Sequence, residues 1–286
     1  MTNDRDETSG FRKLNMAVAR SCRNVVPCSF RAGADALLSR LGNEFPFLRH
    51  MVTDLYPVGS FAERTGTSGG SGLDVMCEFG GARYCQGAAS TALGDFLQCF
   101  RSGSLDEDQH GFSIDARGIG RVRFVPGVRR SDGILLIPDT KRGTWIPSVG
   151  PEHARKVLSL GAIRRCAIRF VKYWNDNQEV HIESFDIDVL MIKTLTAEGL
   201  PGDFHFRLKW FFDEALACLE TGWDNDVEAY RLGFEYLSAS ERRKAGEQFR
   251  KARDIANKAW FLAEFRKGGN PLGPIGFYVM LLNGDT

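Results

Sequence analysis

Residues 59–76 read Gly59-Ser60-Phe61-Ala62-Glu63-Arg64-Thr65-Gly66-Thr67-Ser68-Gly69-Gly70-Ser71-Gly72-Leu73-Asp74-Val75-Met76, and this is the most informative stretch of the chain. It runs from a Gly-Ser turn through a glycine-rich spacer into an apolar segment that predicts a β-strand. Side chains alternate along a strand, so one face is apolar and predicts burial (Leu73, Val75, Cys77, Phe79). The other face is predicted to line a cleft (Gly72, Asp74, Met76, Glu78).

Asp74 is a candidate metal ligand on this second face. Two-metal phosphoryl transfer needs carboxylates that hold two Mg²⁺ ions roughly 3.5–4 Å apart. An acid-x-Asp pair on one strand face, with a third acid from the next strand, meets this need. The residue two positions before Asp74 is Gly72, so the pair is incomplete.

The Gly-Ser turn and Leu73-Asp74-Val75-Met76 resemble the active-site motif of the CD-NTases. These are the bacterial nucleotidyltransferases similar to cyclic GMP-AMP synthase and oligoadenylate synthase. Gly72 then stands where the family has its first acid, and Asp74 where it has its second. The third acid of the family begins a segment like Asp-x-Val-Pro, and Arg123 takes its place in Val122-Arg123-Phe124-Val125-Pro126.

The resemblance extends over roughly residues 30–280. Trp145-Ile146-Pro147 with Pro151-Glu152-His153 is similar to the family's link into its helical lobe. Val171-Lys172-Tyr173-Trp174-Asn175 is similar to its Lys-x-Trp helix, and residues 183–190 to its Ser-aromatic-x-Leu-Glu helix start. The alanine-spaced segment 240–265 is similar to its C-terminal helix.

The resemblance implies an α/β, polymerase-β-like nucleotidyltransferase fold with a nucleotide cleft between two lobes. We expect an N-terminal extension (1–30), a catalytic-type lobe with a mixed sheet (31–150) and a helical lobe like that of oligoadenylate synthase (151–286). The implied ligand is a nucleoside triphosphate, with Mg²⁺ as its metal. In the family, the lysine matching Lys172 contacts phosphate, the serine matching Ser184 binds the triphosphate and the aromatic matching Phe185 stacks on the base. The expected nucleotide-binding residues are Gly59, Ser60, Arg123, Lys172, Ser184 and Phe185.

The same residues also have plain structural interpretations. The Gly-Ser turn is either a tight connection or a set of phosphate donors. Ser184 is either a helix N-cap, assisted by Asp186, or a phosphate ligand. Arg165 and Arg169 lie on one helix face with Lys172, and we expect the two arginines to be solvated.

The two missing acids matter because each carboxylate about 4 Å from Mg²⁺, at an effective dielectric near 20, is worth on the order of 8 kcal/mol before desolvation. Replacing one acid by glycine and another by arginine takes the cluster from about −3 to about 0 in formal charge. Arg123 can instead bind phosphate bidentately, which predicts metal-independent nucleotide binding. Two alternatives stay open: another acid reaches the site (Glu63, Glu78 or Asp115), or the register slips so that Asp74 is the first acid and Met76 the failed second.

The amino-acid composition limits the classes of protein to which this chain can belong. A chain of 286 residues with 43% hydrophobic content can bury a sizeable core, and its net charge of +1 gives no reason to expect duplex DNA as a partner. Seven scattered cysteines predict reduced core thiols in a cytoplasmic protein. No run approaches the roughly 18 apolar residues of a membrane span, so we expect no membrane partner.

Turn-forming residues and hydrophobic periodicity predict the secondary-structure elements. We expect strands at 52–58, 73–79 and 121–125, a hairpin segment at 133–137, and helices at 34–41, 88–100, 152–174, from Ser184 onward and at 240–265.

The leading hypothesis is a nucleotide-binding pseudoenzyme of second-messenger signalling in antiphage defence, which reports its occupancy to a protein partner. The first alternative is an active nucleotidyltransferase that joins NTPs into a linear or cyclic oligonucleotide through Asp74. The second is a structural subunit of a defence complex.

Overall fold

The structure is a computed structural model. Its described residues form two compact units, one made of 34–64 with 72–155 and the other of 65–67 with 156–282. The predicted extension 1–30 and the predicted helix 88–100 lie outside the described residues. The described residues are 34–46, 48, 52–67, 72–79, 106–107, 110–117, 120–139, 143–148, 150–199, 204–225, 230–232, 234, 236–265, 277–278 and 280–282.

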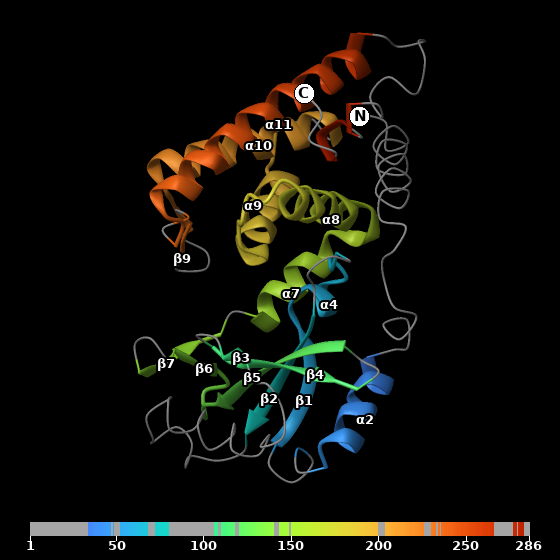
Figure 1. Ribbon diagram of the computed structural model, residues 1–286, viewed down its shortest axis with the longest axis vertical. Helices are drawn as coiled ribbons and strands as arrows, with labels where there is room; N and C mark the ends of the chain where they lie inside the picture. The colour runs from blue at the N-terminus through green and yellow to red at the C-terminus, as the bar shows by residue number, and fades with distance from the viewer. Residues whose placement is uncertain are drawn as a thin grey trace. The chain divides into compact units, whose positions relative to one another are not determined.

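The first unit is built on a mixed sheet (Figure 1). Its strands run in the order β1-β2-β5-β4-β3, and β6 pairs with both β5 and β7. The β2–β5 pairing is parallel and the others are antiparallel. The predicted strands at 52–58 and 73–79 are confirmed, and the predicted strand at 121–125 is part of a longer one. The strands are β1 (Val52–Val58), β2 (Leu73–Phe79), β3 (Asp106–Glu107), β4 (Phe112–Ala116), β5 (Gly120–Arg129), β6 (Leu135–Asp139) and β7 (Thr144–Pro147).

Strand β2 has the two faces that alternation predicts. Its apolar face joins a core cluster with Phe112, Val122 and Phe124 from β4 and β5, and with Leu41 from α2 (Ala34–Glu44). On the other face Met76 packs with Val125 and Leu135 in a second, smaller cluster. The prediction that this whole face lines a cleft was wrong, because Met76 and Glu78 are buried and only Gly72 and Asp74 are half-buried.

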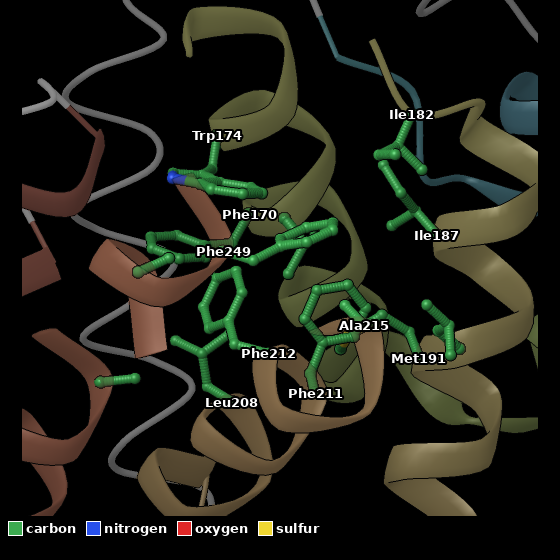
Figure 2. Close-up of a cluster of buried hydrophobic side chains, with 14 of the residues drawn as sticks. Phe170, Trp174, Ile182, Ile187, Met191, Leu208, Phe211, Phe212, Ala215 and Phe249 are labelled. Carbon is green, nitrogen blue, oxygen red and sulfur yellow. The ribbon is translucent and has the colours of Figure 1, made fainter. Parts of the chain in front are cut away.

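The second unit is helical. It contains α8 (Gly161–Asn177), α9 (Ser184–Thr196), α10 (Phe204–Thr221) and α11 (Ala239–Phe265), with a small hairpin of β8 (Trp223–Asn225) and β9 (Tyr230–Leu232). Figure 2 shows the aromatic centre of its core, where the ring of Trp174 meets Phe212 edge-on at 5.0 Å and stacks on Phe249 at 5.7 Å between ring centroids. The predicted helices from Ser184 and over 240–265 are confirmed.

The expected single helix over 152–174 is instead two helices. The first, α7 (Gly150–Ser159), ends before Leu160, and α8 begins at Gly161. Gly161 has φ of +76°, a left-handed conformation that glycine adopts without steric cost. The apolar periodicity continues through this break, so periodicity alone could not locate it.

The expected solvated face of α8 was wrong for Arg165. This side chain is 8% exposed, and its Nη1 donates to the backbone oxygen of Leu158 at 2.8 Å, in the last turn of α7. The guanidinium therefore satisfies a carbonyl at the helix break, where intrahelical hydrogen bonding ends.

The cysteines within the described residues agree with the reduced-thiol prediction. Cys77, Cys166 and Cys218 are buried and unbridged. Burial raises the pKa of Cys77 well above its ordinary value, and burial raises the pKa of Cys218 to about 11. A search of the described helices finds none with the length and apolar character needed to cross a membrane.

Candidate functional site

Asp74 and Arg123 lie opposite each other in the sheet. In the parallel β2–β5 pair Asp74 is in register with Arg123, just as Leu73 is with Val122. Leu73 and Val122 are both buried in the same core cluster, so Asp74 and Arg123 share the opposite face. Neighbouring strands lie about 4.8 Å apart, which puts a cation beside the carboxylate where the family resemblance implies a third acid.

Gly59 lies close to the Asp74 carboxylate. The predicted Gly-Ser turn is the start of a short helix, α4 (Gly59–Glu63), which begins directly after β1. Gly59 has φ of +60°, and a Cβ atom built there would lie 2.6 Å from Asp74 Oδ2. Only glycine meets both the backbone conformation and the close approach, because any Cβ would collide with the carboxylate.

Gly59→Ala is therefore expected to destabilise the protein more than another left-handed glycine does. Gly143, with φ of +65° and no atom within 4 Å of its ideal Cβ, is the matched control. Gly143→Ala should cost about 1 kcal/mol through backbone strain alone. Gly59→Ala should cost at least about 1 kcal/mol more, because the methyl group must also displace Asp74. Urea unfolding measures both, and equal losses would contradict the packing of Asp74 against Gly59.

Gly72 is also closely packed. An ideal Cβ at this position would lie 3.0 Å from the backbone oxygen of Arg121 on β5. An acid at position 72 would therefore require the β5 backbone to shift by a few tenths of an ångström. The position that corresponds to the family's first acid is shaped for a residue without a side chain.

A two-ion Mg²⁺ site does not fit the residues around Asp74. Mg²⁺ takes oxygen ligands in octahedral geometry, and a pair of ions needs several carboxylates. Position 72 offers no side chain, and the in-register position on β5 carries a guanidinium that repels cations. The donor set of this face suits an anion such as phosphate better than a pair of divalent cations.

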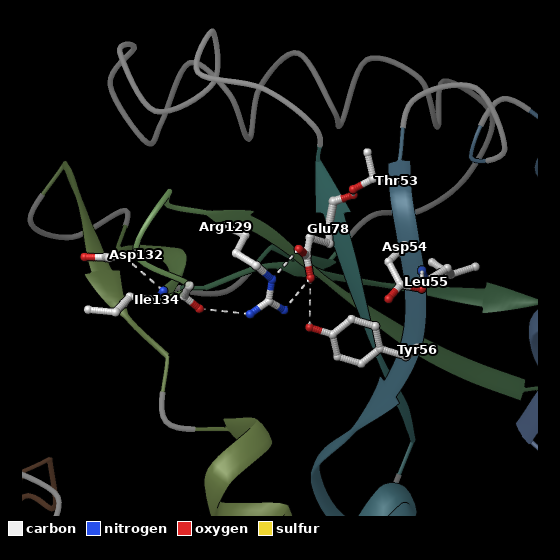
Figure 3. A network of polar contacts seen from close by, with 9 residues as sticks. Thr53, Asp54, Leu55, Tyr56, Glu78, Arg129, Asp132 and Ile134 are labelled. Atoms are coloured by element: carbon white, nitrogen blue, oxygen red, sulfur yellow. Dashed lines mark hydrogen bonds and ion pairs between the residues drawn. The ribbon is translucent and has the colours of Figure 1, made fainter.

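Glu78 does not supply the missing acid, because Arg129 and Tyr56 hold it farther along β2 (Figure 3). Arg129 Nε and Nη2 donate to its two carboxylate oxygens at 2.6 and 2.7 Å, and the Tyr56 hydroxyl donates at 3.3 Å. Burial, with the negative charge of Glu78, raises the pKa of Tyr56 to about 12. The bidentate pair joins β2 to β5, and the Tyr56 hydrogen bond adds β1, on the sheet face opposite the main core.

The other two candidate acids are Asp115 and Glu63, and each lies on another element of the first unit. Asp115 is exposed on β4, where it pairs with Arg121 across the β4–β5 ladder. Glu63 is 4% exposed at the end of α4, and its Oε1 lies 3.9 Å from His153 Nε2 in α7. Met76, the second acid position in the slipped register, is buried against Val125 and Leu135. Positions 72 and 76 are glycine and methionine, so neither register restores the acid-x-Asp pair.

Lys172 lies in the helical unit and is almost fully buried. Its Nζ donates to Asp188 Oδ2 at 2.6 Å and to Thr65 Oγ1 at 3.0 Å, and all three residues are buried. Sequence reasoning missed Asp188 and Thr65 as its contacts. The available signal was the position of Asp188, which stands at the Glu of the Ser-aromatic-x-Leu-Glu pattern. A phosphate that contacts Lys172 must therefore either share the Lys172 ammonium group with the Asp188 carboxylate or displace that carboxylate.

Ser184 and Phe185 open α9, as the sequence predicts, but the capping prediction was wrong. The N-cap residue is Glu183, which makes no side-chain capping bond, and Ser184 is the first helical residue, with an exposed side chain. Phe185 is half-buried beside it. Asp186 in the first turn is fully buried and accepts a hydrogen bond of 2.7 Å from the Tyr236 hydroxyl.

No protein-family model matches this chain, and no curated protein matches its sequence. Solved structures match over nearly its whole length. E. coli MS115-1 CdnC with ATP matches at TM-score 0.66 and 16% identity, covering 94% of this chain and 97% of CdnC. The CD-NTase CdnG of Bradyrhizobium diazoefficiens in complex with GTP matches at TM-score 0.69 and 13% identity, covering 96% and 98%.

The Vibrio cholerae cyclic AMP-GMP synthase DncV, in complex with the linear intermediate pppA(3′,5′)pG, matches at TM-score 0.59 and 11% identity, covering 98% of this chain and 86% of DncV. At these identities the likeness shows the fold alone. The chain has the polymerase-β-like nucleotidyltransferase fold of the CD-NTases, which confirms the resemblance first seen in residues 59–76.

Proposed function

We propose that this protein is a nucleotide-binding pseudoenzyme of the CD-NTase type, in which metal-dependent nucleotidyl transfer has been lost. The observation that carries the proposal is the register of β2 and β5, which sets Arg123 beside Asp74. A guanidinium at this position neutralises the one remaining acid of the triad and replaces a metal ligand with a phosphate ligand. The packing of Gly72 against the Arg121 carbonyl supports the same conclusion.

The proposed ligand is ATP, GTP or a signal derived from them. CdnC and CdnG, which have the same fold, were solved with ATP and with GTP. We assign the phosphates to Gly59, Ser60 and Arg123 in the sheet unit and to Lys172 and Ser184 in the helical unit, and the base to Phe185. The proposal includes a cytoplasmic location and a protein effector that responds to nucleotide occupancy, in second-messenger signalling of antiphage defence.

Incubation of the purified protein with radiolabelled NTPs and Mg²⁺ or Mn²⁺ tests the loss of catalysis. We expect no labelled oligonucleotide above the background of an Asp74→Ala variant. A product that is made by the wild type and disappears in Asp74→Ala would overturn the pseudoenzyme proposal. A CD-NTase of known activity, run in parallel, confirms that the conditions detect a product.

A second candidate function is an active nucleotidyltransferase that makes a linear or cyclic oligonucleotide. The observation that favours it is the retained Asp74, which packs against Gly59 at the end of β1. Under this alternative Asp74 is one metal ligand and a further acid completes the set. The same labelling experiment separates the two functions, because only the active enzyme turns over NTP.

A further inference from the structure

Tyr236 is exposed and yet firmly held. It is 45% exposed, one of the most exposed large apolar side chains in the described part of the chain. Its hydroxyl donates to Asp186 Oδ2 at 2.7 Å and accepts from the backbone N–H of Glu183 at 3.0 Å. Its ring meets the buried Phe234 edge-on, with 6.5 Å between ring centroids. The ring is therefore fixed at the start of α9 while much of its surface faces solvent.

The hydroxyl alone has a structural role. It satisfies the amide of the N-cap residue of α9 and one oxygen of the fully buried Asp186, and buried polar groups need such partners. Burial and the charge of Asp186 raise the pKa of Tyr236, so the hydroxyl stays a donor at neutral pH. These hydrogen bonds need only a hydroxyl group. They do not explain why the aromatic face of Tyr236 is exposed.

We propose that Tyr236 is a nucleobase-binding residue, whose ring stacks on the base of the nucleotide bound at Ser184 and Phe185. This inference rests on the proposed function, because it adds a contact to the same site. Every base has a π-face, and aromatic side chains are the usual platforms for it. A ring that is already immobilised loses little conformational freedom on binding, so stacking on it is favourable.

The hydrogen bonds of the Tyr236 hydroxyl also determine which bases this residue can distinguish. The Tyr236 hydroxyl already donates to Asp186 and accepts from Glu183, so it does not read the hydrogen-bonding edge of a base. Selectivity at this residue comes from stacking area, which favours purines over pyrimidines and treats adenine and guanine alike.

Calorimetric titration of ATP, GTP and inorganic tripolyphosphate into the wild type and Tyr236→Leu tests the inference. We expect Tyr236→Leu to weaken ATP and GTP binding equally, by roughly 5- to 100-fold, and to leave tripolyphosphate binding unchanged. Tyr236→Phe, which keeps the ring, should retain most of the nucleotide affinity. Phe261→Leu is the matched control, because Phe261 is 56% exposed on α11 and lies 22 residues beyond Ala239, about 33 Å along the helix.

Two results would overturn the stacking role. Unchanged ATP affinity in Tyr236→Leu would show that the ring does not touch the base. An equal loss of ATP and tripolyphosphate affinity would show that Tyr236 acts only by holding the first turn of α9. Failure of the wild type to bind either ligand would overturn the proposed function itself, so the two failures are distinct.

Discussion

Lys172→Met is expected to lower the free energy of unfolding by roughly 3–5 kcal/mol, because it leaves the Asp188 carboxylate buried without its counter-ion. Lys172 and Asp188 have side chains only 2% and 3% exposed, and their ion pair is 2.6 Å long. The methionine fills a volume close to that of lysine, so loss of packing contributes little. Chemical denaturation followed by circular dichroism measures the change.

Lys209→Met is the matched control for this prediction. Lys209 pairs with Asp213 at the same 2.6 Å in the same unit, but the two side chains are 25% and 35% exposed. Water screens such a pair, so its loss should cost less than about 1 kcal/mol. The double variant Lys172→Met/Asp188→Leu should recover much of the stability lost by Lys172→Met, because it removes both charges together. Similar small losses for both single variants would contradict a tightly buried ion pair at Lys172.

Arg123→Ala is expected to weaken ATP binding in the presence of EDTA by roughly 10- to 100-fold. Charge-assisted hydrogen bonds contribute about 1.5–3 kcal/mol each, and without metal Arg123 is the counter-ion that the sheet unit provides beside Asp74. Equilibrium dialysis with radiolabelled ATP measures the change. Arg130→Ala is the control, since Arg130 is an exposed arginine in the β5–β6 turn, paired with Asp132. Equal affinities of Arg123→Ala and the wild type would remove Arg123 from the site.

Much of the sheet unit was predictable, because β-strands leave a period of two in the sequence. The alternation of Leu73, Val75 and Cys77 against Asp74 and Met76 gave both the strand and its faces. The second face is nevertheless buried beyond Asp74, since Val125 and Leu135 cover Met76. The residues that bury Met76 belong to strands distant in sequence. A local sequence pattern therefore does not predict this burial.

The sequence offered candidate residues for the site, but their side-chain contacts could not be predicted from it. The register of Asp74 with Arg123 agrees with the motif alignment, because both motifs sit on neighbouring strands. The ion pair of Lys172 with Asp188 and the bond of Tyr236 with Asp186 join residues 16 and 50 positions apart. The break at Gly161 was missed for a different reason, since a single left-handed residue leaves the apolar stripe intact.

Nucleotide binding that does not depend on metal can be tested by a single titration. ATP is titrated calorimetrically into the wild-type protein with Mg²⁺ and again with EDTA. We expect binding in both, with little loss of affinity in EDTA, because we assign the phosphates to Arg123 and not to a metal ion. Binding that requires Mg²⁺ would contradict it and would make an active nucleotidyltransferase the better description of this protein.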